Sequence, residues 1–425
     1  MGVDTAEIAV ADTPFAVQAR TITRTLFGAQ SLGSAATLIV FPIFTILGAQ
    51  LSGVEALAGL PAALSLLGQA ASAFGWGYVM DYLGRRGALI AGALCGSAGM
   101  GMSAVAVAAG SFASLLVGAL LVGVATSALA LSRFVAAEVH PPDQRARAIS
   151  SVVFGGTVGA VLGPAIAGPM AKLAAGAGVS EFIGPYAAGA GLFALVAAVV
   201  FLWLRPEPRD LGRTIALATP GTAPVGGPAR PILAILRQQP ALVAVTAMIF
   251  GQMTMAMLMV ITSLHMRHHD HPLSSISFVI SAHVVGMYAF SIISGRLADA
   301  WGRGPVIMIG ASGLILACLT APLSPHLVPL AAALFLLGLG WNFCYVAGSS
   351  LLADQLSPAE RARTQGFNDL LLGLVSAAGS LGSGIVFAAL GYGAMGLVGA
   401  AAALIPLSLA AWWRLARRPI LEVAP

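Results

Sequence analysis

Charged residues are scarce in this sequence. Asp, Glu, Lys and Arg make up 9% of its 425 positions, whereas apolar residues make up 58%. A soluble globular protein carries about 25% charged residues, so a chain this poor in charge cannot cover a surface that faces water. Most of its exterior must therefore contact a lipid bilayer. The few basic residues are also too scattered to form a nucleic-acid-binding patch, although the pI is near 9.5.

Cysteine is nearly absent as well. The three cysteines show no C-x-x-C spacing, which argues against both a disulfide framework and a zinc knuckle. The sequence also lacks a Walker loop, a zincin pair and a nucleophile elbow, and it leaves no large segment outside the apolar stretches. We therefore predict that the protein is not an enzyme and holds no cofactor.

Long apolar runs fill most of the chain instead. A helix needs about 20 mostly apolar residues to cross a bilayer. This rule predicts an all-α membrane protein with twelve transmembrane helices, at 25–49, 54–79, 87–109, 111–133, 148–173, 184–204, 241–264, 274–294, 305–322, 326–352, 366–390 and 393–413.

The basic residues support this count independently. With the N-terminus inside, all but two of the 21 Lys and Arg residues fall at the inner face, and the exceptions are Lys172 and Arg267. Positive residues gather on the cytoplasmic side of membrane proteins. We therefore expect a multi-pass protein of the bacterial inner membrane with both termini in the cytoplasm. Residues 205–240, rich in Pro, Gly and Arg, read as a cytoplasmic linker between an N-terminal half (1–204) and a C-terminal half (241–425).

One motif, G-x-x-x-D-x-x-G-R, occurs after the second span of each half. Its residues are Gly77, Asp81, Gly84 and Arg85 in the first copy, and Gly295, Asp299, Gly302 and Arg303 in the second. Another related pair follows the fourth span of each half, at Asp143-Gln-Arg145-Ala-Arg147 and Glu360-Arg361-Ala-Arg363.

These motifs resemble those of the major facilitator superfamily, over essentially the whole chain. The resemblance implies the major facilitator fold of two six-helix halves, and a monomeric secondary transporter that works by alternating access. It also implies that the Asp and Arg residues of the repeated motif form a cytoplasmic latch that takes part in gating. The segment from Gly159 to Pro164 resembles the G-x-x-x-G-P motif of many drug antiporters, whose small residues allow close helix packing.

No carboxylate lies in the middle of a predicted span, so the candidate substrate ligands are of another kind. Met255 and Met259 share a helix face in span 7, and His283 and Met287 share one in span 8. Thioethers are soft ligands that select cuprous copper. An outer histidine run could capture the ion first; its members are His265, His268, His269 and His271.

The Met-x-x-x-Met and His-x-x-x-Met pairs resemble those of the CcoA-like copper importers of the superfamily. The resemblance implies copper import, with Met255, Met259, His283 and Met287 as ligands. Met253 and Met257 form a rival pair on a different face.

The alternative is a small organic solute, by riboflavin-like vitamin uptake or by drug/proton antiport. Related branches of the superfamily with much the same motif are linked to riboflavin. Residues able to line such a pathway are Tyr288, Phe290, Trp341, Phe343 and Tyr345, with Asn342 as a polar contact.

Overall fold

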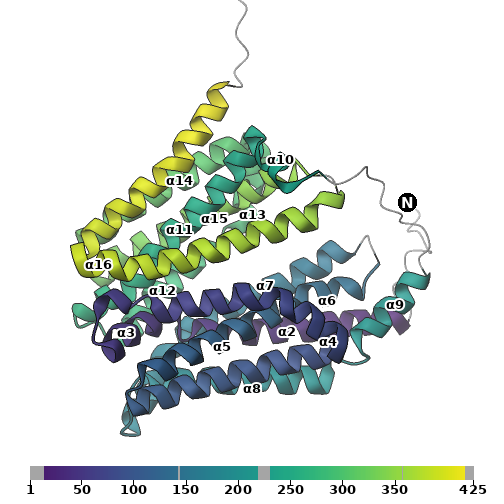
Figure 1. Cartoon of the computed structure of the whole chain (residues 1–425), viewed down its shortest axis with the longest axis horizontal. Helices are drawn as coiled ribbons and strands as arrows, with labels where there is room; N and C mark the ends of the chain where they lie inside the picture. The colour runs from purple at the N-terminus through teal and green to yellow at the C-terminus, as the bar shows by residue number, and fades with distance from the viewer. Residues whose placement is uncertain (1–13, 142–143, 219–229, 357, 417–425) are drawn as a thin grey trace, which may run out of the picture. The chain divides into compact units, whose positions relative to one another are not determined.

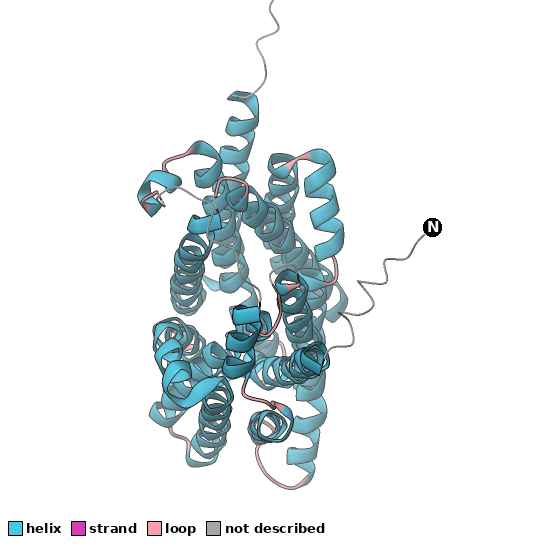
Figure 2. Cartoon of the chain, turned by 90° about the vertical axis from the view of Figure 1, so that its right-hand side faces the viewer, coloured by secondary structure: helices cyan, strands magenta, loops and turns pink. Residues whose placement is uncertain are grey.

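The computed structural model describes residues 14–141, 144–218, 230–356 and 358–416. Within these ranges the chain consists of helices joined by short loops, without a strand (Figures 1 and 2). The all-α prediction is confirmed. The predicted cytoplasmic termini and Asp143 lie outside the described residues, so the structure does not bear on them.

The helices follow one another along the chain with few residues between them. The earlier ones are α2 (Pro14–Leu38), α3 (Phe41–Ser52), the 3-10 turn η1 (Glu55–Leu57), α4 (Leu60–Ala109), α5 (Phe112–Ala130), α6 (Ser132–Glu138), α7 (Arg145–Gly176), α8 (Ile183–Trp203) and α9 (Pro208–Ala218). The later ones are α10 (Ile232–Leu236), α11 (Gln239–His268), α12 (Leu273–Tyr288), α13 (Ser291–Trp301), α14 (Arg303–Thr320), the 3-10 turn η2 (Ala321–Leu323), α15 (Leu327–Ala353) and α16 (Pro358–Ala416).

Eleven of the described segments are long and apolar enough to cross a membrane. The last of them, Gly366–Leu415, has 50 residues and contains a break at Gly391, where φ is 76°. Each side of the break is long enough for one crossing, and Figure 1 shows α16 turning sharply back on itself. Ten single crossings and this double one give the twelve that the sequence predicts.

Two predicted boundaries were wrong for identifiable reasons. The first helix begins at Pro14 rather than at residue 25, because Arg20 and Arg24 lie within α2 instead of ahead of it. This crossing is also interrupted between α2 and α3, next to Pro42, which has no backbone N–H to donate. Along α11 the helix continues to His268, so His265 and His268 belong to its last turn rather than to a loop.

The contacts within the described chain divide it into two units. One comprises Met1–Leu47 and Leu64–Thr222, and the other comprises Gly48–Ala63 and Ala223–Pro425. The segment 48–63 therefore packs with the second unit, although it lies early in the chain. The predicted linker 205–240 is partly helical, because it contains α9 and α10.

In the first unit, α7 packs against α2 through glycines spaced four residues apart. A Cβ atom added at Gly155, Gly159 or Gly163 would lie 2.6, 1.9 or 2.6 Å from a backbone oxygen of α2. These oxygens belong to Phe27, Ser31 and Ala35. The two backbones therefore approach as closely as small-residue seams in membranes allow.

Candidate functional site

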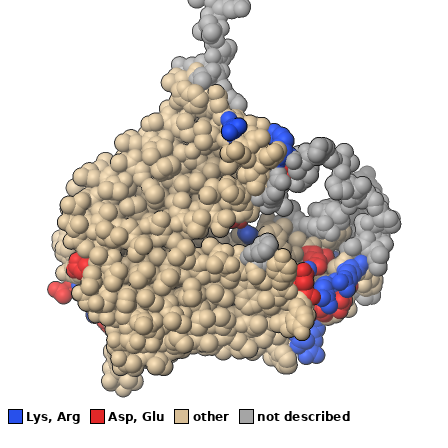
Figure 3. Space-filling view, viewed as in Figure 1, with Lys and Arg blue, Asp and Glu red and all other residues tan. Residues whose placement is uncertain are grey.

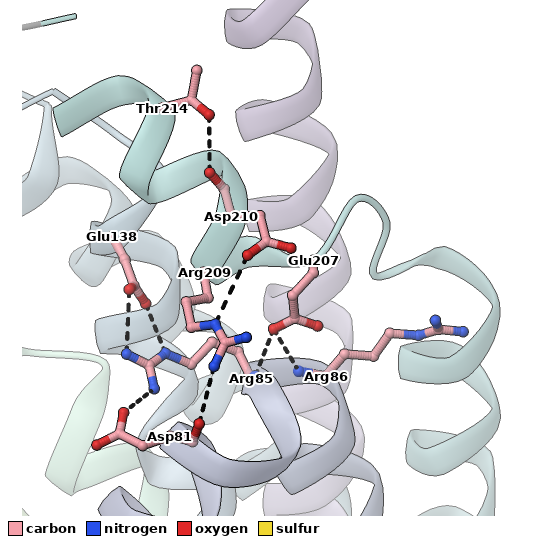
Figure 4. A network of polar contacts seen from close by, with 8 residues as sticks. All are labelled: Asp81, Arg85, Arg86, Glu138, Glu207, Arg209, Asp210 and Thr214. Atoms are coloured by element: carbon pink, nitrogen blue, oxygen red, sulfur yellow. Dashed lines mark hydrogen bonds and ion pairs between the residues drawn. The ribbon is translucent and has the colours of Figure 1, made fainter. Parts of the chain in front are cut away.

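The repeated motif forms a charged network in the first unit. The Arg85 guanidinium donates to both oxygens of Glu138 at 2.9 and 3.2 Å, and to the Asp81 carboxylate at 3.0 Å (Figure 4). Because Arg85 is mostly buried and Glu138 is half-buried, this forked ion pair is better shielded than an exposed one. Asp81 lies at the open side of the network, with its side chain 75% exposed.

The same network holds the start of the helix segment after Gly84. Gly84 adopts φ 78°, which a residue with a side chain rarely adopts. Directly after it, the backbone N–H groups of Arg85 and Arg86 donate to Glu207, just ahead of α9. A carboxylate at this position caps the helix start and complements its dipole.

The second copy of the motif repeats this arrangement in the second unit. Gly302 has φ 89°, and the Arg303 guanidinium donates to Asp299 and, at 3.3 Å, to Asp354. The first glycine of each motif copy, Gly77 or Gly295, is not required by close packing, because a Cβ atom added there would meet no atom within 4 Å. The gating role of these residues stays a prediction.

A further ion pair lies at the end of the linker. Arg230 donates to Glu360 from its backbone N–H at 2.9 Å, from Nε at 2.7 Å and from one Nη at 2.9 Å. The same Nη donates to the Gln355 carbonyl at 2.7 Å. The hydrogen bond to Glu360 raises the pKa of Arg230, so this guanidinium stays charged at any physiological pH. Figure 3 shows few charged side chains on the face drawn, most of them toward its edges.

His283, one of the four predicted copper ligands, lies on α12 and is fully buried against α15. Its Nδ1 is 2.9 Å from the Leu334 carbonyl oxygen. Since a carbonyl can only accept, Nδ1 carries the proton and Nε2 keeps a free lone pair in the neutral ring. Within the described chain, this Nε2 has no hydrogen-bond partner. Close packing of Gly286 and Gly338 against the facing backbones fixes the helix pair.

The three methionines predicted as copper ligands are buried too, because Met255, Met259 and Met287 are each less than 10% exposed. Met257, of the rival pair Met253 and Met257, faces α16. Its Cγ is the nearest atom to a Cβ added at Gly379 on that helix. Helix α11 packs mainly against α16, and α12 packs mainly against α15. The two helices α11 and α12 make few contacts with each other.

Each of the four outer histidines contacts a different group of the protein. His265 stacks on Tyr392 with ring centroids 4.0 Å apart, and His268 lies 3.4 Å from Glu55. His269 donates to the backbone oxygen of His265, and His271 donates to that of Pro325. Across the residues that the structure describes, no three His, Cys, Asp or Glu side chains are grouped so that they could hold a metal ion.

A second constellation lies at the middle of the spans of the second unit. Trp341 stacks on Tyr345, with centroids 4.8 Å apart and planes inclined by 15°, and meets the edge of Tyr288 at 6.2 Å. The indole N–H donates to Gln252 Oε1 at 2.7 Å, and Gln252 Nε2 donates to Ser376 Oγ at 2.7 Å. Four helices, α11, α12, α15 and α16, thus contribute to one cluster of aromatic, amide and hydroxyl side chains.

Asn342, expected as a polar substrate contact, forms hydrogen bonds between helices. Its amide donates to the Met287 carbonyl and to Ser291 Oγ, and it accepts from Ser294 Oγ at 2.6 Å. It is 1% exposed and therefore joins α15 to α12 and α13. The polar residue that sequence reasoning missed is Gln252, whose signal was a lone amide in the middle of an apolar span.

Comparison with known proteins gives a consistent family likeness. The sequence profile described as Major Facilitator Superfamily matches residues 26–272 and 244–424. The uncharacterized MFS-type transporter YdeG of Bacillus subtilis is 34% identical over 396 residues, which cover 92% of each chain. The riboflavin transporter RfnT of Brucella anthropi is 29% identical over 344 residues, covering 81% of this chain and 83% of RfnT.

A solved structure shares the fold. It is a bacterial homolog of the human lysosomal transporter Spinster, in an inward-facing and occupied conformation. It aligns with a TM-score of 0.69 at 18% identity, and covers 94% of this chain and 97% of that one. At this identity the likeness concerns the fold alone.

Proposed function

The chain belongs to the Major Facilitator Superfamily of secondary transporters, and we propose that it imports a flat, uncharged aromatic solute of the flavin class. It is a multi-pass membrane transporter and not an enzyme. The proposed location is the bacterial cytoplasmic membrane with both termini inside, which the distribution of Lys and Arg supports.

The observation that carries this proposal is the aromatic cluster of Tyr288, Trp341 and Tyr345. Trp341 and Gln252 each lie near the middle of a helix that crosses the membrane, the depth at which secondary transporters bind their substrates. Polar groups at this depth are costly, so those that are present are candidate functional residues. The nearly parallel rings of Trp341 and Tyr345 suit a planar ligand that stacks on them.

The similarity to RfnT supports the same class of solute. RfnT is a riboflavin transporter, and the two chains align over more than four fifths of their lengths. Riboflavin has a planar tricyclic ring that could stack on the aromatic pair, and polar edges that could bond to the amide of Gln252. The direct test is uptake of radiolabelled riboflavin by a bacterial strain that neither makes nor imports it, with and without this protein.

We expect Trp341→Ala to reduce riboflavin uptake about tenfold or more, because stacking of a base on an aromatic ring contributes about 1–3 kcal/mol. Trp341→Phe should keep part of the activity, since it retains a stacking ring. Initial uptake rates, corrected for the amount of protein in the membrane, provide the measurement. Phe278→Ala is the control, because Phe278 is 55% exposed on α12. Equal loss in this control would contradict a special role for Trp341.

Copper import is a second candidate, favoured by the free Nε2 lone pair of His283 one helical turn from Met287. If copper is the cargo, His283→Leu and Met259→Leu should abolish cellular copper accumulation, measured by elemental analysis, while the protein inserts normally. Met257→Leu, on the face toward α16, should leave accumulation unchanged. Wild-type copper levels in the double variant of His283 and Met259 would eliminate this candidate.

A further inference from the structure

Gln252 is held in one orientation by two hydrogen bonds. The indole N–H of Trp341 can only donate, so it must face the amide oxygen Oε1. The Ser376 hydroxyl donates its own proton to the Leu372 carbonyl at 2.7 Å, so its oxygen is left to accept from Nε2. The chemistry of both partners therefore fixes which end of the amide is oxygen and which is nitrogen.

Half of the hydrogen-bonding capacity of this amide is left over. A primary amide has two N–H donors and two acceptor lone pairs, and Trp341 and Ser376 engage one of each. One N–H and one lone pair of Gln252 remain. Gln252 is only half-buried, in contrast to Thr254 two residues later, which is fully buried and donates to the Gly399 carbonyl.

We propose that Gln252 is the specificity-determining residue of the transporter, and that it recognises a cis-amide or imide edge on a planar heteroaromatic substrate. Such an edge presents a carbonyl oxygen beside an N–H, which complements the free N–H and lone pair of the glutamine. This inference rests on the proposed function, because it assigns a role within the same aromatic cluster.

The position of Trp341 explains why the stacking and the hydrogen bonding would act together. One face of its indole stacks on Tyr345, and its N–H orients Gln252. A ligand ring packed against the aromatic pair would therefore lie beside an amide that is already oriented. Preorganised groups of this kind reject ligands that lack the matching partner, because a buried polar group is then left unpaired.

The test compares riboflavin with 3-methylriboflavin, in which a methyl group replaces the imide proton. We expect the wild-type protein to favour riboflavin by about tenfold in KM, the effect of one desolvated hydrogen bond. In Gln252→Met the ratio of the two KM values should fall to nearly one, mainly because the KM for riboflavin rises. Thr254→Val is the matched control on the same helix, and its preference should equal that of the wild type.

Each outcome decides a separate question. If the wild-type protein takes up riboflavin and Gln252→Met keeps the full preference, the role of Gln252 is refuted while the proposed function stands. Failure of the wild type to take up riboflavin refutes both. If Gln252→Met reaches the membrane but transports neither flavin, the ratio of the two dissociation constants, measured by tryptophan quenching in purified protein, takes the place of the KM ratio.

Discussion

Replacing Gly159 with valine is expected to leave little or no folded protein. A Cβ atom at this position would lie 1.9 Å from the Ser31 carbonyl oxygen and 2.8 Å from the Ser31 carbonyl carbon. Both are backbone atoms of α2, so no side chain can rotate to make room. The two helices would have to separate, and the seam that also includes Gly155 and Gly163 would open.

The yield of monodisperse protein in detergent and the midpoint of its thermal unfolding measure this effect. Gly191→Val is the control, because a Cβ at Gly191 on α8 would meet no atom within 4 Å. Valine is also a better helix former than glycine, so this change carries no cost in helix propensity. Should Gly159→Val prove as stable as Gly191→Val, α2 and α7 would not be in backbone contact.

Two glycines of the seam, Gly159 and Gly163, were visible in the sequence as part of a small-residue motif, and so were the elements that depend on local pattern. Hydropathy located the spans, and the repeated motif located Gly84 and Gly302, which both adopt positive φ where two helices meet. These features are encoded within a few consecutive residues. The same is true of the Arg85–Asp81 and Arg303–Asp299 pairs, whose members are four residues apart.

Contacts between distant segments could not be predicted in this way. Gln252 meets Trp341 and Ser376, which lie 89 and 124 residues further along the chain. A search for carboxylates and metal ligands passed over this amide, because its importance comes from partners on other helices. His271 shows the converse, since its place in a histidine run suggested a metal ligand, whereas the fold directs it to the Pro325 carbonyl.

Removing Arg230 should destabilise the second unit more than removing any other linker arginine. Glu360 is the reason, because its side chain is only 3% exposed and Arg230 donates to both of its oxygens. Without that guanidinium the buried carboxylate loses charged hydrogen-bond donors to both of its oxygens, and breaking a buried ion pair in this way costs more than the intact pair contributes. We expect Arg230→Met to lower the midpoint of thermal unfolding by roughly 10 °C and to loosen the start of α16.

Two companion variants separate the buried charge from the loss of a side chain. Arg237→Met removes a cation from the same end of the linker and should change the midpoint little, since no ion pair of Arg237 is found among the described residues. Adding Glu360→Leu to Arg230→Met removes the buried carboxylate as well, and should restore most of the lost stability if charge burial is the cause. If the double variant is no more stable than Arg230→Met, the linker end is held by packing, and the hydrogen bonds to Glu360 contribute little.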